Sequence, residues 1–370
     1  MKIEEIDSNF KPHLIGDREV VYLDVLKKPF SVEGQPWPSP AGKKWPVARI
    51  PPYLTPDEVN NDALQEGWHM TTGAAVRFRS DSPFIAIKAT LSHSCDMNHM
   101  ARAGSSGFDI YAGVNGRWLH AGTACPSPKE VELERLLFVR DVEDTGMKDF
   151  LLNLPLYGGV DAISIGLAPD ANVEAPPPHK NGKILFYGSS VTQGACASHP
   201  GAVHSSLLCR KLDAEQINMG FSGAARGEIA MAKVIAGMKD LTAFFYHYDA
   251  NAPTLEHLQK THEPFFKVIR AAQPKLPIVI TGICDYLNGL CPARERDYYL
   301  PRRNVLLTTY RNAIAAGDRH VYYIDSSTLF GDVDPTECST EKCHPNDLGF
   351  YRMYETILPV LQRAIAEREP

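Results

Sequence analysis

The stretch Lys183-Ile184-Leu185-Phe186-Tyr187-Gly188-Ser189-Ser190-Val191-Thr192-Gln193-Gly194 decides the fold that we predict for this chain. Its apolar run predicts a buried strand, and the glycines on each side of the serines predict a tight turn into a helix. Such a turn holds the Ser190 hydroxyl at the end of the strand, where a base can reach it. The stretch matches neither GxSxG nor GxxxxGK[ST]. Taken alone, it is also consistent with a loop that only connects two elements or binds an anion.

Beyond this stretch, apolar runs alternate with helical patterns to the end of the chain. The runs are residues 184–187, 244–246, 278–283 and 321–324, and the helical patterns are 202–212, 254–272, 304–316 and 347–366. Alternation of this kind predicts an α/β domain with a parallel sheet and helices on both faces. Reactive groups in such sheets gather at the carboxyl ends of the strands.

The first part of the chain has a different pattern. Short β-rich segments are separated by Gly, Pro, Asp and Ser, namely residues 20–25, 76–78, 84–91, 108–111 and 162–167. Many short strands with turns between them predict a β-sandwich. Residues 169–183 contain three consecutive prolines, which neither a helix nor a central strand accommodates. We therefore expect an accessory domain over 1–168, a linker over 169–183 and a catalytic domain over 184–370.

Composition and charge narrow the class of protein. The chain has 370 residues, 44% of them hydrophobic and 22% charged, which is the ordinary range for a globular protein. The net charge is −6 and no dense Lys/Arg block occurs, so neither nucleic acid nor an anionic membrane is the expected partner. No apolar run is long enough for a membrane span, and residues 1–10 lack the profile of a secretory signal. We expect a cytoplasmic protein whose eight scattered cysteines are reduced thiols.

A second chemically informative segment lies near the carboxyl terminus, in Glu341-Lys342-Cys343-His344-Pro345-Asn346-Asp347. A serine is a weak nucleophile until an imidazole removes its proton, and the imidazole needs a carboxylate to orient it. Glu341, three residues before His344, can curl back to that ring, with Asp334 and Glu337 as alternatives. Zinc binding by Cys338, Cys343 and His344 is a further alternative, although it leaves the fourth ligand unidentified.

Four segments, taken in order, carry a family resemblance. Gly188-Ser189-Ser190-Val191-Thr192 resembles the GDSxT block of the SGNH (GDSL-type) hydrolases, with Ser189 in place of Asp. Residues 218–223 (NMGFSG) resemble the second block, 248–253 (YDANAP) the third, and Glu341 to His344 the final DxxH block. The resemblance implies a flavodoxin-like, three-layer α/β/α domain. Ser106-Gly107-Phe108-Asp109-Ile110-Tyr111 resembles part of the β-sandwich (jelly-roll-like) domain that precedes it in two-domain carbohydrate acetylesterases.

The same resemblance implies roles for particular residues. Ser190 would be the nucleophile, His344 the general base, and Glu341 the acid that replaces the Asp of DxxH. The oxyanion hole would combine the amides of Ser190 and Gly223 with the side chain of Asn251. Preorganised donors of this kind stabilise a tetrahedral intermediate by roughly 3–4 kcal/mol each. Neither a metal nor an organic cofactor is implied.

The expected function is removal of O-acetyl groups from carbohydrate, including acetylated mannooligosaccharides, by a serine esterase. The alternatives are a lipase or lysophospholipase, and a carbohydrate-binding protein that has lost catalysis. Residues 92–105 form a long loop in which His99 could contact a sugar, or whose methionines could simply cover their own domain. An accessory domain with large flat sheets also favours a homodimer.

Overall fold

The structure is a computed structural model that describes residues 13–141, 144, 146–287 and 289–368. Residues 1–10, in which we expected no secretory signal, lie outside this range. The chain divides into two compact units. Unit 1 comprises residues 1–48, 69–178 and 198–201, and unit 2 comprises 49–68, 179–197 and 202–370. The division therefore differs from the predicted single boundary after residue 168. Residues 49–68 belong to unit 2 although they lie before that boundary, and residues 198–201 belong to unit 1 although they lie after it.

Unit 1 is built from two antiparallel sheets that share one hydrophobic core. The first sheet, in spatial order, consists of β1 (His13–Ile15), β2 (Arg18–Asp24), β12 (Gly159–Leu167), β7 (Phe84–His93) and β10 (Glu132–Val139). The second consists of β13 (Val173–Glu174), β6 (Ala75–Ser80), β11 (Lys148–Asn153), β8 (Phe108–Val114) and β9 (Arg117–Ala124), with β3 (Ser31–Glu33) also paired to β6. A small ladder of β4 (Trp37–Pro38) and β5 (Val47–Ala48) and the short helix α3 (Arg102–Ser105) complete the unit.

Alternating side chains fill the core of unit 1. In β12, Ile163 and Ile165 are buried while Ser164 between them is only half-buried, as the period-2 pattern predicts. Phe78 and Phe150, on the paired strands β6 and β11, stack with their ring centroids 5.2 Å apart. Antiparallel sheets in this part of the chain are confirmed, and the jelly-roll connection stays a prediction.

The segment expected to be a linker, residues 169–183, contains a strand. β13 pairs with β6, and Val173 is fully buried in the shared core. The three prolines at 176–178 follow this strand, which lies at the edge of its sheet, so no ladder hydrogen bond is lost to them. Residues 173–174 of the predicted linker thus form an edge strand of unit 1, and the prolines lie beyond that strand.

A buried carboxylate ties residues 198–201 into unit 1. Asp109, which has no solvent exposure, accepts hydrogen bonds from the Asn153 side chain at 2.6 Å and from the Gly201 amide at 2.5 Å. The Asp109 oxygen that accepts the Gly201 amide, Oδ2, also contacts His199 Nδ1 at 2.5 Å. A Cβ at Gly201 would lie 2.4 Å from the Tyr111 ring, so only glycine fits. Asp109 therefore binds the chain a few residues after the Ser190 helix, and Tyr111 packs against it at Gly201.

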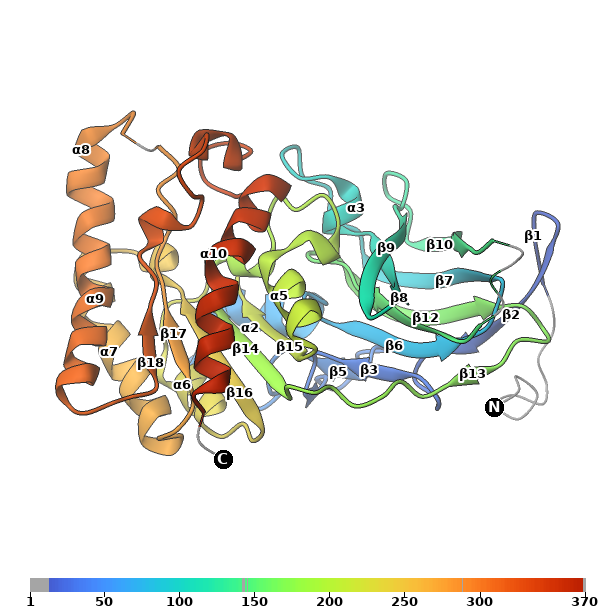
Figure 1. Ribbon diagram of the computed structural model, residues 1–370, viewed down its shortest axis with the longest axis horizontal. Helices are drawn as coiled ribbons and strands as arrows, with labels where there is room; N and C mark the ends of the chain where they lie inside the picture. Colours follow the sequence, from blue (N-terminus) through green and yellow to red (C-terminus); the bar gives the residue numbers. More distant parts are fainter. Residues whose placement is uncertain (1–12, 142–143, 145, 288, 369–370) are drawn as a thin grey trace. The chain divides into compact units, whose positions relative to one another are not determined.

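Unit 2 contains a five-stranded parallel sheet, drawn in Figure 1. Its strands, in spatial order, are β15 (Glu215–Gly220), β14 (Lys183–Gly188), β16 (Leu241–His247), β17 (Ile278–Ile280) and β18 (Val321–Tyr323). Every residue of β16 is buried, as expected for a strand covered on both faces. The strand order reverses direction around β14, and ligands of such sheets bind outside the carboxyl ends of the strands at that point. The fold therefore places a site where β14 ends.

Four helices of unit 2 correspond to the predicted helical patterns, and the others were not among those patterns. The helices of this unit are α2 (Asn61–His69, whose last residue belongs to unit 1), α4 (Ser190–Gln193), α5 (His204–Leu212), α6 (Ile229–Ala236), α7 (Leu255–Ala272), α8 (Pro292–Arg294), α9 (Leu300–Ala315) and α10 (Asp347–Ala366). The single turns of this unit are η2 (Asp249–Asn251), η3 (Glu295–Tyr299), η4 (Ser326–Thr328) and η5 (Pro335–Cys338), while η1 (Pro200–Ala202) belongs to unit 1 except for its last residue. α6 packs on α7 and α7 on α9, while α5 packs on α10. A three-layer arrangement of these groups stays a prediction.

Within the described ranges, none of the helices combines the length and the apolar character that crossing a membrane requires. All eight cysteines are described and each is free.

Candidate active site

The turn after β14 presents Ser190 as the sequence predicts. The Ser189 side chain caps α4 by accepting a hydrogen bond from the Val191 amide at 3.3 Å, so this serine supports the turn in place of the usual aspartate. Gly188 has no room for a side chain, because a Cβ there would lie 2.1 Å from Thr192 Oγ1. The helix ends at Gly194 in the left-handed conformation, with φ at 108°. Both glycines of the quoted stretch are thus required by the backbone.

The structure brings Ser190, His344 and Glu341 together. Ser190 Oγ lies 2.8 Å from His344 Nε2, and His344 Nδ1 is hydrogen-bonded to Glu341 Oε1. The other carboxylate oxygen accepts the Cys343 and His344 amides, both at 3.0 Å. With Nδ1–H donating to Glu341, Nε2 is the acceptor for the serine hydroxyl. The three groups can therefore convert the hydroxyl into a nucleophile.

The side chains around His344 raise its pKa. Burial lowers the pKa of His344, but the Cys343 and Glu341 side chains raise it more, so that the pKa lies above its ordinary value. For Glu341, burial works to raise the pKa, and the hydrogen bonds from the His344 ring and from two backbone amides lower it below its usual range. Glu341 is thus a carboxylate that stabilises the imidazolium formed when His344 takes the serine proton.

The alternatives to Glu341 are not found at His344. The two ring nitrogens face Ser190 and Glu341, so neither Asp334 nor Glu337 is the carboxylate partner. Among the described residues, Cys338 and Cys343 do not belong to a group of side chains whose ligand atoms lie close enough together with His344 to hold a metal ion. Cys338 is instead buried under the start of α10, where its carbonyl accepts the Asn346 amide at 3.1 Å.

The three expected oxyanion donors follow three neighbouring strands. Ser190 follows β14, Gly223 follows β15 and Asn251 follows β16. These three strands end at the same level of the sheet, because Gly188 at the end of β14 is in register with Gly220 of β15 and His247 of β16. Gly223 has φ at 70°, and no atom lies within 4 Å of the position a Cβ would take. The Asn251 side chain donates one N–H to the Phe221 carbonyl at 2.8 Å, which leaves its second N–H for another acceptor.

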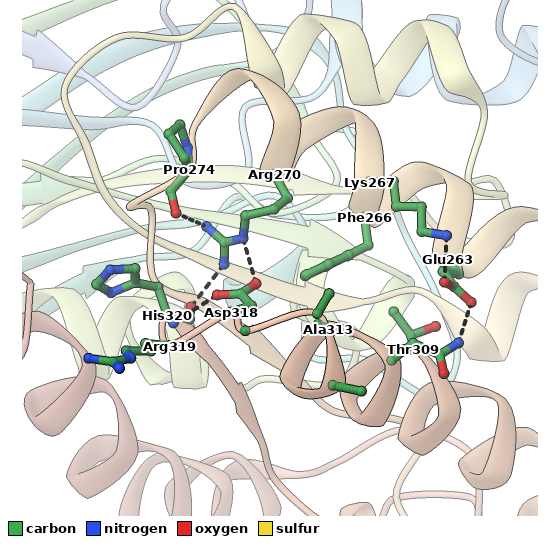
Figure 2. A pocket seen from close by; sticks show the side chains of 14 residues that line it. Glu263, Phe266, Lys267, Arg270, Pro274, Thr309, Ala313, Asp318, Arg319 and His320 are labelled. Atoms are coloured by element: carbon green, nitrogen blue, oxygen red, sulfur yellow. Dashed lines mark hydrogen bonds and ion pairs between the residues drawn. The ribbon is translucent and has the colours of Figure 1, made fainter.

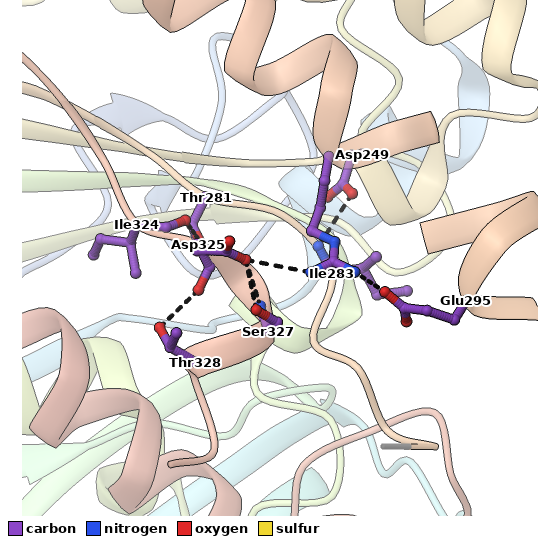
Figure 3. Close-up of polar contacts among 9 residues, drawn as sticks. Asp249, Thr281, Ile283, Glu295, Ile324, Asp325, Ser327 and Thr328 are labelled. Atoms are coloured by element: carbon purple, nitrogen blue, oxygen red, sulfur yellow. Dashed lines mark hydrogen bonds and ion pairs between the residues drawn. The ribbon is translucent and has the colours of Figure 1, made fainter. Parts of the chain in front are cut away.

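Buried polar contacts fix the loop that carries Asn251. The Asp249 carboxylate accepts the Ile283 amide at 3.1 Å, a contact drawn in Figure 3. Burial raises the pKa of Asp249 to about 6, against the opposing effect of the Ile283 amide and of Arg302. Arg302, itself buried, donates to the Asp249 and Ala252 carbonyls at 2.8 and 3.0 Å. These bonds hold both ends of η2, in which Asn251 is the last residue.

The sequence did not predict a single role for residues 284–303. In the structure, an arginine of this segment forms an ion pair with a glutamate of the same segment. Arg303 is paired with Glu295 and lies 3.4 Å from Asp325. Arg302 and Arg294 stack over Tyr298, at 4.4 and 5.4 Å from its ring centroid. The described residues of this loop thus build a helical turn that leads into α9.

The hollow shown in Figure 2 lies between α7 and α9, has a volume of about 1000 Å³ and contains no predicted site residue. Its charged side chains pair with one another. Arg270 contacts Asp318 at 2.7 Å and also donates to backbone carbonyls, and Glu263 contacts Lys267 at 2.7 Å. We therefore interpret this hollow as a helix packing feature.

His99 lies in unit 1, in a segment that is partly ordered by short-range pairing. Met97 and Met100 form an isolated β-bridge, and Met100 is buried. His99 Nδ1 lies 3.1 Å from the Asn98 side chain. A sugar contact by His99 and the covering of their own domain by the methionines both stay predictions.

Sequence reasoning missed a set of residues from the first part of the chain. Arg49, Asn60 and Glu66 belong to unit 2 and bind the backbone of the loop that carries Gly223. Asn60 does show a local signal, because its side chain caps α2 by accepting the Ala63 amide at 3.1 Å. Nothing local indicates a partner more than a hundred positions away.

Comparisons with known proteins identify the family of the chain. The profile of the GDSL-like Lipase/Acylhydrolase family matches residues 181–362, which include the residues expected to form the triad and the oxyanion hole. A second profile, described as "N-terminus of Esterase_SGNH_hydro-type", matches residues 20–173. The chain belongs to the SGNH (GDSL-type) hydrolases. Residues 107–111 (GFDIY) fit the name of the second profile, GxDLY, at every position except Ile110, and the aspartate of this segment is Asp109, which binds residues 199 and 201.

Solved structures share the fold of this SGNH hydrolase. A protein described as a GDSL-like lipase from Bacteroides ovatus has a TM-score of 0.81 at 24% identity, covering 94% of this chain and 98% of the other. The salicylyl-acyltransferase SsfX3 from a tetracycline biosynthetic pathway has a TM-score of 0.73 at 17% identity, covering 94% and 97%. A family two carbohydrate esterase from Cellvibrio japonicus has a TM-score of 0.59 at 15% identity, covering 94% and 98%. No curated protein matches the chain.

Proposed function

We propose that this SGNH hydrolase is a serine esterase that removes O-acetyl groups from carbohydrate through an acyl-enzyme on Ser190. The observation that carries the proposal is the 2.8 Å contact between Ser190 Oγ and His344 Nε2, with Glu341 bound to the opposite side of the ring. A serine, an imidazole and a carboxylate in this order perform acyl transfer on several unrelated folds.

The first half of the reaction transfers the acetyl group to the enzyme. Ser190 Oγ attacks the acetyl carbonyl carbon while His344 Nε2 takes the hydroxyl proton. The carbonyl oxygen becomes an oxyanion, which the Ser190 and Gly223 amides and the Asn251 side chain would stabilise. When the bond to the sugar oxygen breaks, His344 returns the proton to that oxygen and the deacetylated sugar leaves.

The second half releases the acetyl group. Water attacks the acetyl-Ser190 carbonyl as His344 takes one of its protons, and the tetrahedral intermediate breaks down to acetate. The proton then returns to Ser190 Oγ, so the enzyme ends in its starting state. Glu341 stays ionised throughout, because its low pKa and its two amide donors favour the charged form.

The choice of acetylated carbohydrate is supported by the neighbouring folds. The Cellvibrio japonicus protein is a family two carbohydrate esterase, and an acetyl xylan esterase from Butyrivibrio proteoclasticus has a TM-score of 0.55 over 95% of this chain. The profile of the matched family also includes lipases. A lipase or lysophospholipase is therefore the second candidate.

Acetate release from acetylated manno-, xylo- and glucooligosaccharides, measured beside short- and long-chain p-nitrophenyl esters, separates these candidates. We expect acetate release from at least one oligosaccharide, and faster hydrolysis of the acetyl ester than of esters of eight or more carbons. Preference for the long esters would favour the lipase. Absence of hydrolysis with every ester would favour the carbohydrate-binding protein that has lost catalysis.

A further inference from the structure

A short segment from the first part of the chain braces the loop that carries Gly223. Residues 49–68, which include most of α2, belong to unit 2. Arg49 has no solvent exposure, and its guanidinium lies 4.8 Å from the centroid of the Phe221 ring. It donates to the Gly220 carbonyl at 2.6 Å and to the Glu66 carbonyl at 3.0 Å. One side chain thus joins the last turn of α2 to the end of β15.

The residues on both sides of Gly223 are bound by α2 and by the residue that precedes this helix. The Glu66 carboxylate accepts the Ser222 amide at 2.7 Å. On the other side, the Asn60 side chain donates to the Ala224 carbonyl at 2.7 Å and to Glu228 at 2.5 Å. The brace therefore holds the residue before Gly223 and the residue after it.

The Ser222 amide is also held from the nucleophile side. Gln193 Oε1 accepts this amide at 2.9 Å, and Gln193 is the last residue of α4, which begins at Ser190. The Ser222 N–H is thus shared between the Glu66 carboxylate and the side-chain oxygen of Gln193. A displacement of this peptide would move the Gly223 amide relative to Ser190.

A half-buried acid carries a desolvation cost at this position. Burial raises the pKa of Glu66 to about 7, against the lowering effects of Arg49 and the Ser222 amide, while Asp62 raises it further. A neutral apolar side chain would fill the same volume without that cost. The acid is therefore explained by the hydrogen bond that it accepts and not by packing alone.

We propose that Glu66 is a positioning residue, whose carboxylate fixes the Ser222 peptide so that the adjacent Gly223 amide keeps its place as an oxyanion donor. This inference rests on the proposed function, because it assigns the Gly223 amide to the oxyanion hole. Glu66 acts through the backbone and does not touch the substrate. Loss of its contact should therefore lower kcat and leave KM nearly unchanged, since the oxyanion forms only during the reaction.

The test compares four variants in steady-state hydrolysis of p-nitrophenyl acetate. Glu66→Leu removes the acceptor, Glu66→Asp keeps the charge but falls short of the Ser222 amide, and Glu66→Gln keeps both the length and an acceptor oxygen. Gln65→Leu, at the exposed neighbouring position of α2, is the matched control. We expect kcat to fall about tenfold to a hundredfold in the Leu and Asp variants, with KM within about twofold of wild type. The Gln variant should retain most of the wild-type kcat, and the control should match wild type.

Two results would overturn the positioning role: Leu and Asp variants with wild-type kcat, or Asp and Gln variants with equal kcat. If the Leu variant does not fold, as circular dichroism would show, the comparison of Asp with Gln decides. Ser190→Ala, measured beside them, separates this inference from the function on which it rests. Activity retained by Ser190→Ala would refute the proposed function itself, whereas its loss together with wild-type kcat in the Leu and Asp variants would refute the role of Glu66 alone.

Discussion

Glu341 occupies a position where the related motif has an aspartate, and its loop accommodates the extra methylene. The loop is closed by two backbone bonds, from the Thr340 amide to the His344 carbonyl at 3.0 Å and from the Asn346 amide to the Cys338 carbonyl at 3.1 Å. Within it, the carboxylate binds both the ring and the amide of His344. The orientation of the imidazole is thus set by one side chain with several contacts.

Replacing Glu341 by Gln should have two effects on hydrolysis. We expect kcat/KM to fall about 10³- to 10⁴-fold, as for loss of the acid in comparable triads. The acid limb of the pH profile should also move to lower pH. Activity rises with pH as His344 loses its proton, and Glu341 is one of the groups that raise the pKa of this histidine, so its removal lowers that pKa. Steady-state kinetics between pH 5 and pH 9 would measure both effects.

Glu337→Gln is the matched control for this prediction, because Glu337 is an exposed acid in the same loop. It should leave the rate and the pH profile unchanged. An acid limb at the same pH in Glu341→Gln and wild type would contradict the electrostatic role assigned to Glu341.

For individual residues, the sequence predicted those that lie in motifs and missed those that act through tertiary contacts. Ser190, His344 and Glu341 occur within short segments whose residue types and order point to one kind of chemistry. Glu66 binds an amide 156 positions away, and its neighbours in α2 carry no sign of that partner. Such a contact depends on the fold and not on any local pattern.

Among the elements, α10 and β15 show where sequence patterns succeed and where they fail. α10 spans Asp347–Ala366 as predicted, because Asn346 caps it by accepting the Gly349 amide at 3.0 Å and a long amphipathic pattern follows. β15 and α6 are short, and neither was among the predicted elements. β15 has six residues and mixes polar with apolar side chains, and α6 has eight residues that are apolar except for Lys233, so neither presents a long amphipathic pattern.

The first residue of α5 carries a prediction about stability. The His204 ring is fully buried and stacks on Phe350 of α10, with centroids 5.7 Å apart and planes 8° apart. Within the described residues neither ring nitrogen has a hydrogen-bond partner, and burial, with a smaller contribution from His247, lowers the pKa of His204 to about 3. Phenylalanine would keep the ring and remove the titrating group.

We therefore expect His204→Phe to be more resistant to acid than wild type. The unfolded chain takes up a proton at His204 near pH 6.5 but the folded chain only near pH 3, so this residue costs stability as the pH falls between those values. The variant should lose up to about 1.4 kcal/mol less per pH unit in that window. Urea unfolding at pH 8, 6 and 5 would measure this, with pH 8 as the reference. Parallel losses in both proteins would contradict the assignment.

For the molecule as a whole, the important feature is that neither unit is a continuous stretch of chain. Unit 2 takes residues 49–68 from within the first part of the sequence, and unit 1 takes residues 198–201 from within the second. The sequence predicted the two kinds of sheet, because their strand patterns differ. It did not predict this exchange, since the exchanged segments carry no change in composition.

A fragment of residues 179–370 should accordingly fail to reproduce the hydrolase. Without residues 49–68, the carbonyl of Gly220 and the amide of Ser222 lose the partners that Arg49 and Glu66 provide. We expect the fragment to be unfolded or at least a hundredfold less active on p-nitrophenyl acetate than the full chain. Circular dichroism and the esterase assay would measure this. A folded fragment with the activity of the full chain would show that the segment is dispensable.

The most direct test of the account is covalent labelling of Ser190 by a fluorophosphonate, followed by peptide mapping and a parallel assay of ester hydrolysis. We predict that the label attaches to the peptide that contains Ser190, that hydrolysis is lost in step with labelling, and that Ser190→Ala is neither labelled nor active. A label on another residue, or hydrolysis that persists in Ser190→Ala, would contradict the assignment of Ser190 as the nucleophile.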